Sequence, residues 1–226
     1  MHFRLTATLL VSFVLLCSLK SQAQIGTLPA ININKGLKKD WSLNFKWESR
    51  QAKLPDDLEN GEGSRFKYVL SDFSLTLSKK VGLNNSLAAG YLMRIEDNRF
   101  IQRATQQFTI VKGYSFFRLA HRFTTDQTFD PESPTEYRIR YRITPEFPLS
   151  GQSIDPKEFY FKFNNEYLNS FQGKSYDLEL RFIPLLGYEF TDTSKLEFGL
   201  DYRVNSFLNN ATNQHYWINL SWYLKI

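Results

Sequence analysis

The sequence predicts an all-β protein, an antiparallel up-and-down transmembrane β-barrel of about ten strands that follows a cleaved signal peptide. Three observations lead to this prediction. Apolar and polar residues alternate with a period of two through most of the chain, the alternating segments are unusually long, and the first residues have the composition of an export signal. The mean hydropathy of −0.39 is too polar for a bundle of membrane helices.

Residues 1–23 have the three parts of a secretory signal peptide. Arg4 supplies a positive charge, residues 9–16 form an apolar run (LLVSFVLL), and residues 21–23 (SQA) place small side chains where cleavage occurs, before Gln24. The apolar run is about half of the ~20 residues that a spanning helix needs. We therefore expect a cleaved signal peptide and not an uncleaved membrane anchor.

The single cysteine of the chain, Cys17, lies inside this segment. A lipoprotein signal needs a small residue directly before the cysteine, and Leu16 is not small. Cleavage would leave residues 24–226 as one barrel domain with no thiol, which excludes disulfides, a cysteine nucleophile and cysteine-bound metals. It would also leave 26 basic residues against 23 acidic ones, and a net charge of +3 is too weak and too scattered to predict a nucleic-acid partner.

Eleven segments after the signal read as strands. A soluble strand averages about 5–6 residues and a membrane strand needs about 9–11, so the length of most of these segments favours a membrane barrel. The alternation is clearest at 41–47 (WSLNFKW) and at 196–204 (LEFGLDYRV). The predicted strands are 28–34, 41–53, 65–78, 86–96, 100–111, 114–125, 135–145, 157–168, 175–190, 195–206 and 214–226.

The alternation gives the positions of the strands but leaves open how many of them belong to the barrel. Bacterial single-chain barrels usually have an even number of strands. Counting back from a periplasmic C terminus gives ten strands from residue 41 onward, and residues 24–40 then become a lead-in, a plug or an additional strand. Twelve strands are the alternative. The last strand resembles a barrel-assembly signal, with Trp222, Leu224 and Ile226 on one face, although such signals usually end in an aromatic residue.

Alternation alone does not say which face of the sheet lies outside. A soluble periplasmic barrel or sandwich would bury the aromatic face. Strand length, the aromatic last strand and the export signal favour apolar residues that face lipid, where an Arg or Lys at the midplane costs about 2–4 kcal/mol. We also expect short periplasmic turns and longer polar outer loops, such as 55–64, 125–134 and 169–174.

Several of these strands resemble a known family. The carriers of the resemblance are 41–50 (WSLNFKWESR), 73–94 (FSLTLSKKVGLNNSLAAGYLMR), 136–143 (EYRIRYRI) and 195–205 (KLEFGLDYRVN). They are similar to the domain-of-unknown-function 2490 family, whose members are predicted outer-membrane barrels of Gram-negative bacteria. Members often carry a tryptophan in the first strand after the signal, and residues 25–34 have none. The resemblance spans nearly the whole exported chain and implies no particular activity.

Histidines are the first candidates for chemistry, because barrel hydrolases use them as bases. His121 is in phase with Leu119 and Phe123, which places it on the lipid-facing or interfacial side. His215 is predicted to face the lumen near the outer rim and is the only candidate for a catalytic base. Asp201 and Ser221 would lie too far below it to complete a triad. No phosphate loop, metal-ligand spacing or cofactor motif is found, so we expect no cofactor and no metal.

Charged side chains on the inward faces are more informative. The interior of a barrel near ten strands is largely filled by side chains, and unpaired buried charge is costly, so these charges are expected to pair with one another inside the lumen. The acidic partners would be Glu48, Asp72, Glu166 and Asp201. The full predicted set is Lys46, Glu48, Arg50, Asp72, Arg94, Arg118, Arg122, Arg138, Arg140, Arg142, Lys162, Glu166, Arg181, Asp201 and Arg203.

Arg138, Arg140 and Arg142 share one face of a strand, spaced about 6.6–6.8 Å apart. Such a basic cluster is either part of the salt-bridged filling or an eyelet that selects anions. The leading expectation is thus a non-enzymatic outer-membrane barrel with a structural or surface-interaction role. The alternatives are a narrow channel or transporter for small solutes, with anions as the candidates if the basic cluster forms an eyelet, and an outer-rim lipid or peptide hydrolase. The expected partners are outer-membrane lipid and, during biogenesis, the barrel-assembly machinery.

Overall fold

The computed structural model describes residues 23–53, 66–208 and 212–226, and in these residues it contains eleven β-strands. The strands are β1 Ala23–Gly36, β2 Trp41–Lys53, β3 Lys67–Lys80, β4 Asn85–Glu96, β5 Arg99–Gly113, β6 Arg118–Asp130, β7 Ser133–Pro148, β8 Phe159–Gln172, β9 Ser175–Thr191, β10 Ser194–Asn205 and β11 Asn213–Lys225. Their lengths run from 12 to 17 residues. Within the described residues, no helix is long and apolar enough to span a membrane.

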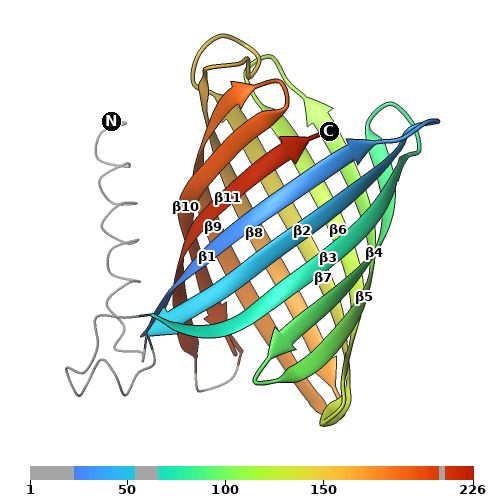
Figure 1. The fold of residues 1–226 in the computed structure, drawn as a ribbon, viewed down its shortest axis with the longest axis vertical. Coiled ribbons are helices and arrows are strands. Elements are labelled where there is room, and N and C mark those ends of the chain that lie inside the picture. Colours follow the sequence, from blue (N-terminus) through green and yellow to red (C-terminus); the bar gives the residue numbers. More distant parts are fainter. Residues whose placement is uncertain (1–22, 54–65, 209–211) are drawn as a thin grey trace.

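The strands form one closed barrel in which each strand pairs with its sequence neighbours, and β1 pairs with β11 to complete the ring (Figure 1). All pairs between sequence neighbours are antiparallel, whereas β1 and β11 are parallel. The parallel seam follows from the odd number, because the first and last strands of an eleven-strand meander run the same way. The expectation of antiparallel pairing throughout is therefore wrong at this one seam.

The segment 24–40 contains the strand that makes the number odd. Of the three roles considered for it, the additional strand is the one observed: β1 pairs with β2 on one side and with β11 on the other. The even-number rule favoured ten strands because it describes barrels closed by antiparallel pairing, and this barrel does not close that way. A further consequence is that Ala23 and Lys225 lie at opposite ends of the barrel.

The connections differ from the expected pattern of longer outer loops. Only two residues separate β6 from β7 and β8 from β9, so the predicted loops 125–134 and 169–174 are tight hairpins. Their polar residues belong to strands, since Thr124, Asp126 and Thr128 are buried inside the barrel. The predicted loop 55–64 lies outside the described residues. The longest connection between strands that is described throughout, 149–158, lies at the opposite end, where β11 finishes.

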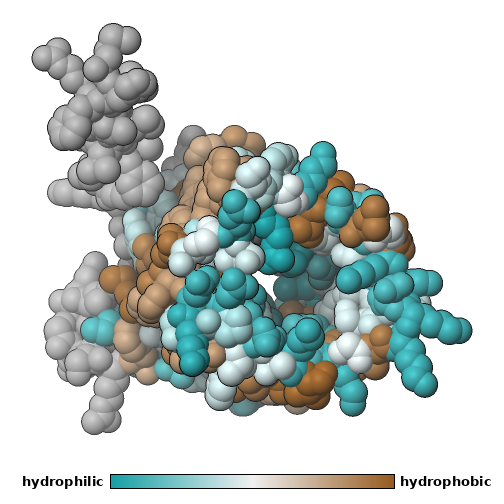
Figure 2. Space-filling model, turned by 90° about the horizontal axis from the view of Figure 1, so that it is seen from above, coloured by the Kyte–Doolittle hydropathy of each residue, from teal (hydrophilic) through white to brown (hydrophobic). Residues whose placement is uncertain are grey.

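The two faces of the sheet have the distribution predicted for a barrel with apolar residues outside. Figure 2 shows hydrophilic side chains around a hollowed end and hydrophobic ones on the flanks. The exposed apolar side chains include Phe45, Leu75, Leu77, Leu87, Tyr91, Phe123, Ile139, Phe161, Leu186, Phe198, Leu200, Ile218, Leu220 and Trp222. The buried charged residues are Glu48, Asp72, Arg103, Asp126, Glu146, Glu166, Glu197, Asp201 and Arg203.

A small polar cluster interrupts the apolar outer face at β5 and β6. The Gln106 and Gln127 side-chain amides hydrogen-bond to each other at 3.2 Å, and the Thr125 hydroxyl donates to Gln106 Oε1 at 2.8 Å. These groups are exposed but satisfy one another. The cluster therefore carries no charge and leaves few donors unpaired on that face.

Candidate functional site

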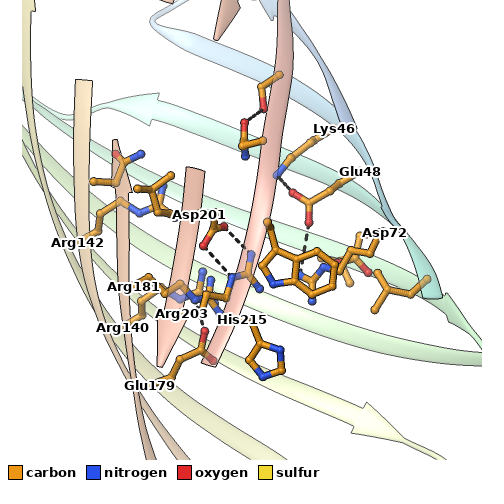
Figure 3. Close-up of a pocket in the computed structure, with 18 of the residues that line it drawn as sticks. Lys46, Glu48, Asp72, Arg140, Arg142, Glu179, Arg181, Asp201, Arg203 and His215 are labelled. Atoms are coloured by element: carbon orange, nitrogen blue, oxygen red, sulfur yellow. Dashed lines mark hydrogen bonds and ion pairs between the residues drawn. The ribbon is translucent and has the colours of Figure 1, made fainter. Parts of the chain in front are cut away.

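All fifteen charged side chains predicted for the lumen line two cavities inside the barrel. The N-side cavity, at the end where β1 begins, has a volume of about 470 Å³. The C-side cavity, toward the end where β11 finishes, has a volume of about 660 Å³. The two share lining residues, among them Arg140, Arg142 and Lys162. Figure 3 shows how side chains from several strands converge on the lumen.

Two fully buried carboxylates organise the central network. Asp126 on β6 accepts from Arg138 Nε at 2.5 Å and from Arg140 Nη2 at 3.0 Å, and Glu166 on β8 accepts from Arg142 Nε at 2.6 Å. Arg140 joins the two, because its Nε lies 3.7 Å from Glu166 Oε1. The cluster Arg138, Arg140 and Arg142 is thus tied to the neighbouring strands on both sides of β7.

Arg181 and Arg103 extend this network to β9 and β5. Arg181 Nη1 lies 2.9 Å from Glu166 Oε1, and its Nε is hydrogen-bonded to Glu179. Arg103 Nε lies 3.7 Å from Asp126 Oδ1. One chain of ion pairs therefore crosses five adjacent strands, from β5 to β9, and fixes their side chains relative to one another.

The other three predicted acidic residues also have basic partners. Arg94 donates from Nε and Nη2 to the two carboxylate oxygens of Asp72, at 2.8 and 2.9 Å. Arg203 binds Asp201 in the same way, at 2.9 and 2.7 Å. Lys46 Nζ donates to Glu48 at 2.6 Å. Bidentate pairs of this kind restrict both partners to one geometry.

Sequence reasoning missed several members of the lumenal network. Asp126 was assigned to a loop, although its phase with Thr124 and Thr128 was available as a signal. Glu197 has the same phase as Asp201, and it accepts from Tyr160 Oη at 2.8 Å and from Lys162 Nζ at 2.5 Å. Arg103 lies in a strand where Phe100 and Ile101 are adjacent, so the alternation there gave no clear face.

The cavity linings carry more basic than acidic side chains. The basic residues, thirteen in all, are Lys46, Arg50, Arg94, Arg103, Arg118, Arg122, Arg138, Arg140, Arg142, Lys162, Arg181, Lys195 and Arg203. The acidic residues, eight in all, are Glu48, Asp72, Glu96, Glu146, Glu166, Glu179, Glu197 and Asp201. Asp126 is buried and lines neither cavity, and when it is added to the acidic residues, basic side chains still outnumber acidic ones in the lumen. This excess of positive charge favours anions over cations there.

His215 lines the N-side cavity, at the end of the barrel where β11 begins. Its Nδ1 lies 2.7 Å from Gln24 Oε1, its Nε2 lies 3.3 Å from Asn205 Nδ2, and its ring stacks on Trp217. Asp201 is instead bound to Arg203, and the Ser221 hydroxyl donates to Asn219. The structure therefore does not bring His215, Asp201 and Ser221 together.

His121 and the exposed apolar residues of the last strand lie on the outer side of the barrel. His121 Nδ1 lies 2.8 Å from the Tyr141 hydroxyl, next to Phe123. The exposed Trp222 donates from its indole Nε1 to Ser194 Oγ at 3.0 Å, and the Ile226 backbone N–H donates to the carbonyl of Asn34 at 2.8 Å. β11, which carries Trp222 and Leu224, is thus paired on both edges, and Ile226 directly follows it.

The described residues hold no group of three or more His, Cys, Asp and Glu side chains arranged to bind a metal ion. Neither a curated protein nor a solved structure matches the chain significantly. The model of one family, described as "Protein of unknown function (DUF2490)", matches residues 26–216, which is most of the chain and runs from within β1 to the first residues of β11. The chain therefore belongs to the DUF2490 family.

Proposed function

We propose that this protein is an outer-membrane β-barrel of a Gram-negative cell envelope, exported by a signal peptide at residues 1–23. The observation that carries the proposal is the reversed distribution of side chains. Carboxylates such as Asp126 and Glu166 are fully buried in the lumen, whereas phenylalanine and leucine side chains are exposed around the barrel. Soluble proteins rarely expose apolar surface that is continuous around the molecule, so a lipid bilayer is the solvent that suits this surface.

Strand length and closure support the same proposal. Every described strand has at least 12 residues, more than the roughly 9–11 that a tilted membrane strand needs. A closed barrel also leaves no sheet edge unpaired, which a bilayer requires because it offers no hydrogen bonds. The outward-facing residues of the strand centres, such as Leu75, Ile139 and Leu200, carry no charge.

The proposed role is structural or surface-interacting and not enzymatic. The ion pairs that cross five strands make the lumen a stiff, polar filling, and a stiff barrel is a suitable support for connections that meet other molecules at its ends. Outer-membrane lipid and the barrel-assembly machinery are the proposed partners. We place the end of the barrel where β11 finishes in the periplasm.

The basic excess of the lumen favours a second candidate function, a narrow path for small anionic solutes. Planar-bilayer recordings separate the two roles: a silent barrel excludes the path, whereas an anion-selective current supports it. Arg140→Ala should then change the anion preference of the current, because Arg140 lines both cavities. In a barrel whose lumen does not conduct, the same substitution changes only the stability of the protein.

Quenching of tryptophan fluorescence by brominated lipids tests the membrane location. Trp222 is exposed on the outer face and Trp217 is buried in the lumen. One variant keeps only Trp222 and a matched variant keeps only Trp217, with the remaining tryptophans changed to phenylalanine. We expect quenching of Trp222 and little quenching of Trp217 in vesicles. Equal, weak quenching of both would contradict insertion, and stronger quenching of Trp217 would contradict the assignment of inside and outside.

A further inference from the structure

Arg122 differs from every other arginine in the part of the chain that the structure describes. Each of the others has a carboxylate oxygen within 4.0 Å, and Arg122 has none. Its side chain lines the C-side cavity from β6. An unpaired guanidinium offers five N–H donors and keeps its charge under all physiological conditions.

The surroundings of Arg122 add positive charge next to it, which makes binding of an anion there more favourable. The residue directly across the β6–β7 ladder is Arg142, and two like charges in such a pair destabilise a sheet. Arg142 is itself committed to Glu166 at 2.6 Å. Arg122 thus adds a second positive charge to a position where the nearest carboxylate is already used.

The rest of the C-side cavity is also basic. Eight basic side chains line it, namely Lys46, Arg103, Arg118, Arg122, Arg140, Arg142, Lys162 and Lys195, against the two acidic ones Glu146 and Glu166. Both acids are already paired: Glu146 with Arg118 at 2.5 Å, and Glu166 with Arg142 at 2.6 Å. Lys195 has no carboxylate within 4.0 Å among the described residues and lies over the rings of Tyr160 and Tyr223.

We propose that the C-side cavity binds a small oxyanion of the phosphate class, held by Arg122 with Lys195 as a second source of positive charge. A planar guanidinium matches the spacing of two oxygens on a tetrahedral anion, which a spherical halide cannot use. A volume of about 660 Å³ holds such an anion together with water or an ester group. The inference deepens the second candidate function, but it requires only the folded barrel.

The test is calorimetric titration of the purified, folded barrel in detergent with inorganic phosphate, at constant ionic strength set with chloride. The wild type should bind phosphate. Arg122→Gln should weaken binding by about tenfold or more, because a hydrogen bond to a charged group contributes roughly 1.5–3 kcal/mol. Arg122→Lys keeps the charge but loses the two-pronged geometry and should show an intermediate loss.

Arg99→Gln is the matched control. Arg99 pairs with Glu132 at the hairpin end of β5, outside both cavities, so its loss removes the same charge and should leave phosphate binding unchanged. Folding of each variant is checked by its mobility shift on boiling, and Arg122→Gln should fold because it removes a like-charge contact. A folded wild type that does not bind phosphate overturns the inference, as does equal binding by wild type and Arg122→Gln. Neither result bears on the membrane location, which the tryptophan experiment tests separately.

Discussion

Trp217 lies directly opposite Gly26 in the parallel seam between β11 and β1, and its ring fills the space that a side chain at position 26 would need. A Cβ atom at Gly26 would come within 2.3 Å of the Trp217 ring and 2.6 Å of the Gln51 carbonyl. Trp217 is buried with Leu28 and Ala52 in a small apolar cluster inside this end of the lumen. The seam that closes the barrel therefore depends on a glycine at position 26.

Gly26→Val should weaken the seam. The added side chain meets both an aromatic ring and backbone, so we expect a loss of about 1–3 kcal/mol in the free energy of unfolding. Urea titration of the barrel in micelles measures it. Gly36→Val is the control on the same strand, because a Cβ at Gly36 meets nothing within 4 Å. Equal losses of stability at the two positions would show that the contact with Trp217 is not the reason why position 26 requires glycine.

Glu166→Gln should be among the most destabilising single changes in the lumen. It removes the charge that three arginines share, and breaking a buried ion pair costs about 3–5 kcal/mol because the partner charges stay buried. Glu132→Gln, which affects only the exposed pair with Arg99, should change stability by less than about 1 kcal/mol. Urea midpoints of both variants provide the comparison, and a Glu166→Gln protein as stable as the control contradicts a structural role for the network.

Leu200→Arg separates a membrane barrel from a soluble one. Leu200 is exposed near the middle of β10, so in water an arginine there would change stability by only about 0.5 kcal/mol or less. In a bilayer the same change should cost about 2–4 kcal/mol. Leu208→Arg, beyond the end of β10 and 62% exposed, is the control and should be tolerated in vesicles. Urea unfolding from vesicles measures the stability of both variants. Equal stability of the two variants would contradict a lipid-facing Leu200.

In the proposed outer-membrane barrel, the odd strand number places the start of β1 and the end of β11 on opposite sides of the membrane. Because the only cysteine is Cys17, within the proposed signal peptide, Ile25→Cys and Ile226→Cys each introduce a unique thiol into the exported chain. A maleimide too large to cross the outer membrane should label Ile25→Cys on intact cells and Ile226→Cys only after permeabilisation. Labelling of both thiols under the same condition would contradict an eleven-strand barrel that spans the membrane.

The sequence allowed the strands to be predicted wherever one face is apolar and the other polar. The segment 195–206 was expected and β10 spans Ser194–Asn205, because Leu196, Phe198 and Leu200 alternate with polar residues. Prediction failed where both faces are polar. In β6, Thr125 and Gln127 point outward while Thr124 and Asp126 point inward, so a strand that continues to Asp130 resembled a loop.

The ion-pair partners in the lumen could not be predicted from the sequence for a different reason. Alternation places a side chain on a face, but the register between strands decides which charges meet. The β6–β7 register sets Asp126 opposite Arg138, and the β7–β8 register sets Glu166 opposite Arg142. A shift of two residues would keep every charge inside and change every pair between neighbouring strands. The parallel seam was equally hidden, since it depends on whether the strand total is odd.

The most direct test of the central claim is the mobility of the protein on a denaturing gel, with and without boiling, after separation of the outer-membrane fraction. A closed transmembrane barrel predicts that the protein is found in that fraction and migrates differently before and after boiling. A protein that stays in the soluble periplasmic fraction and shows no shift on boiling would contradict the account, because its exposed aromatic face would then have to be the core of a different structure.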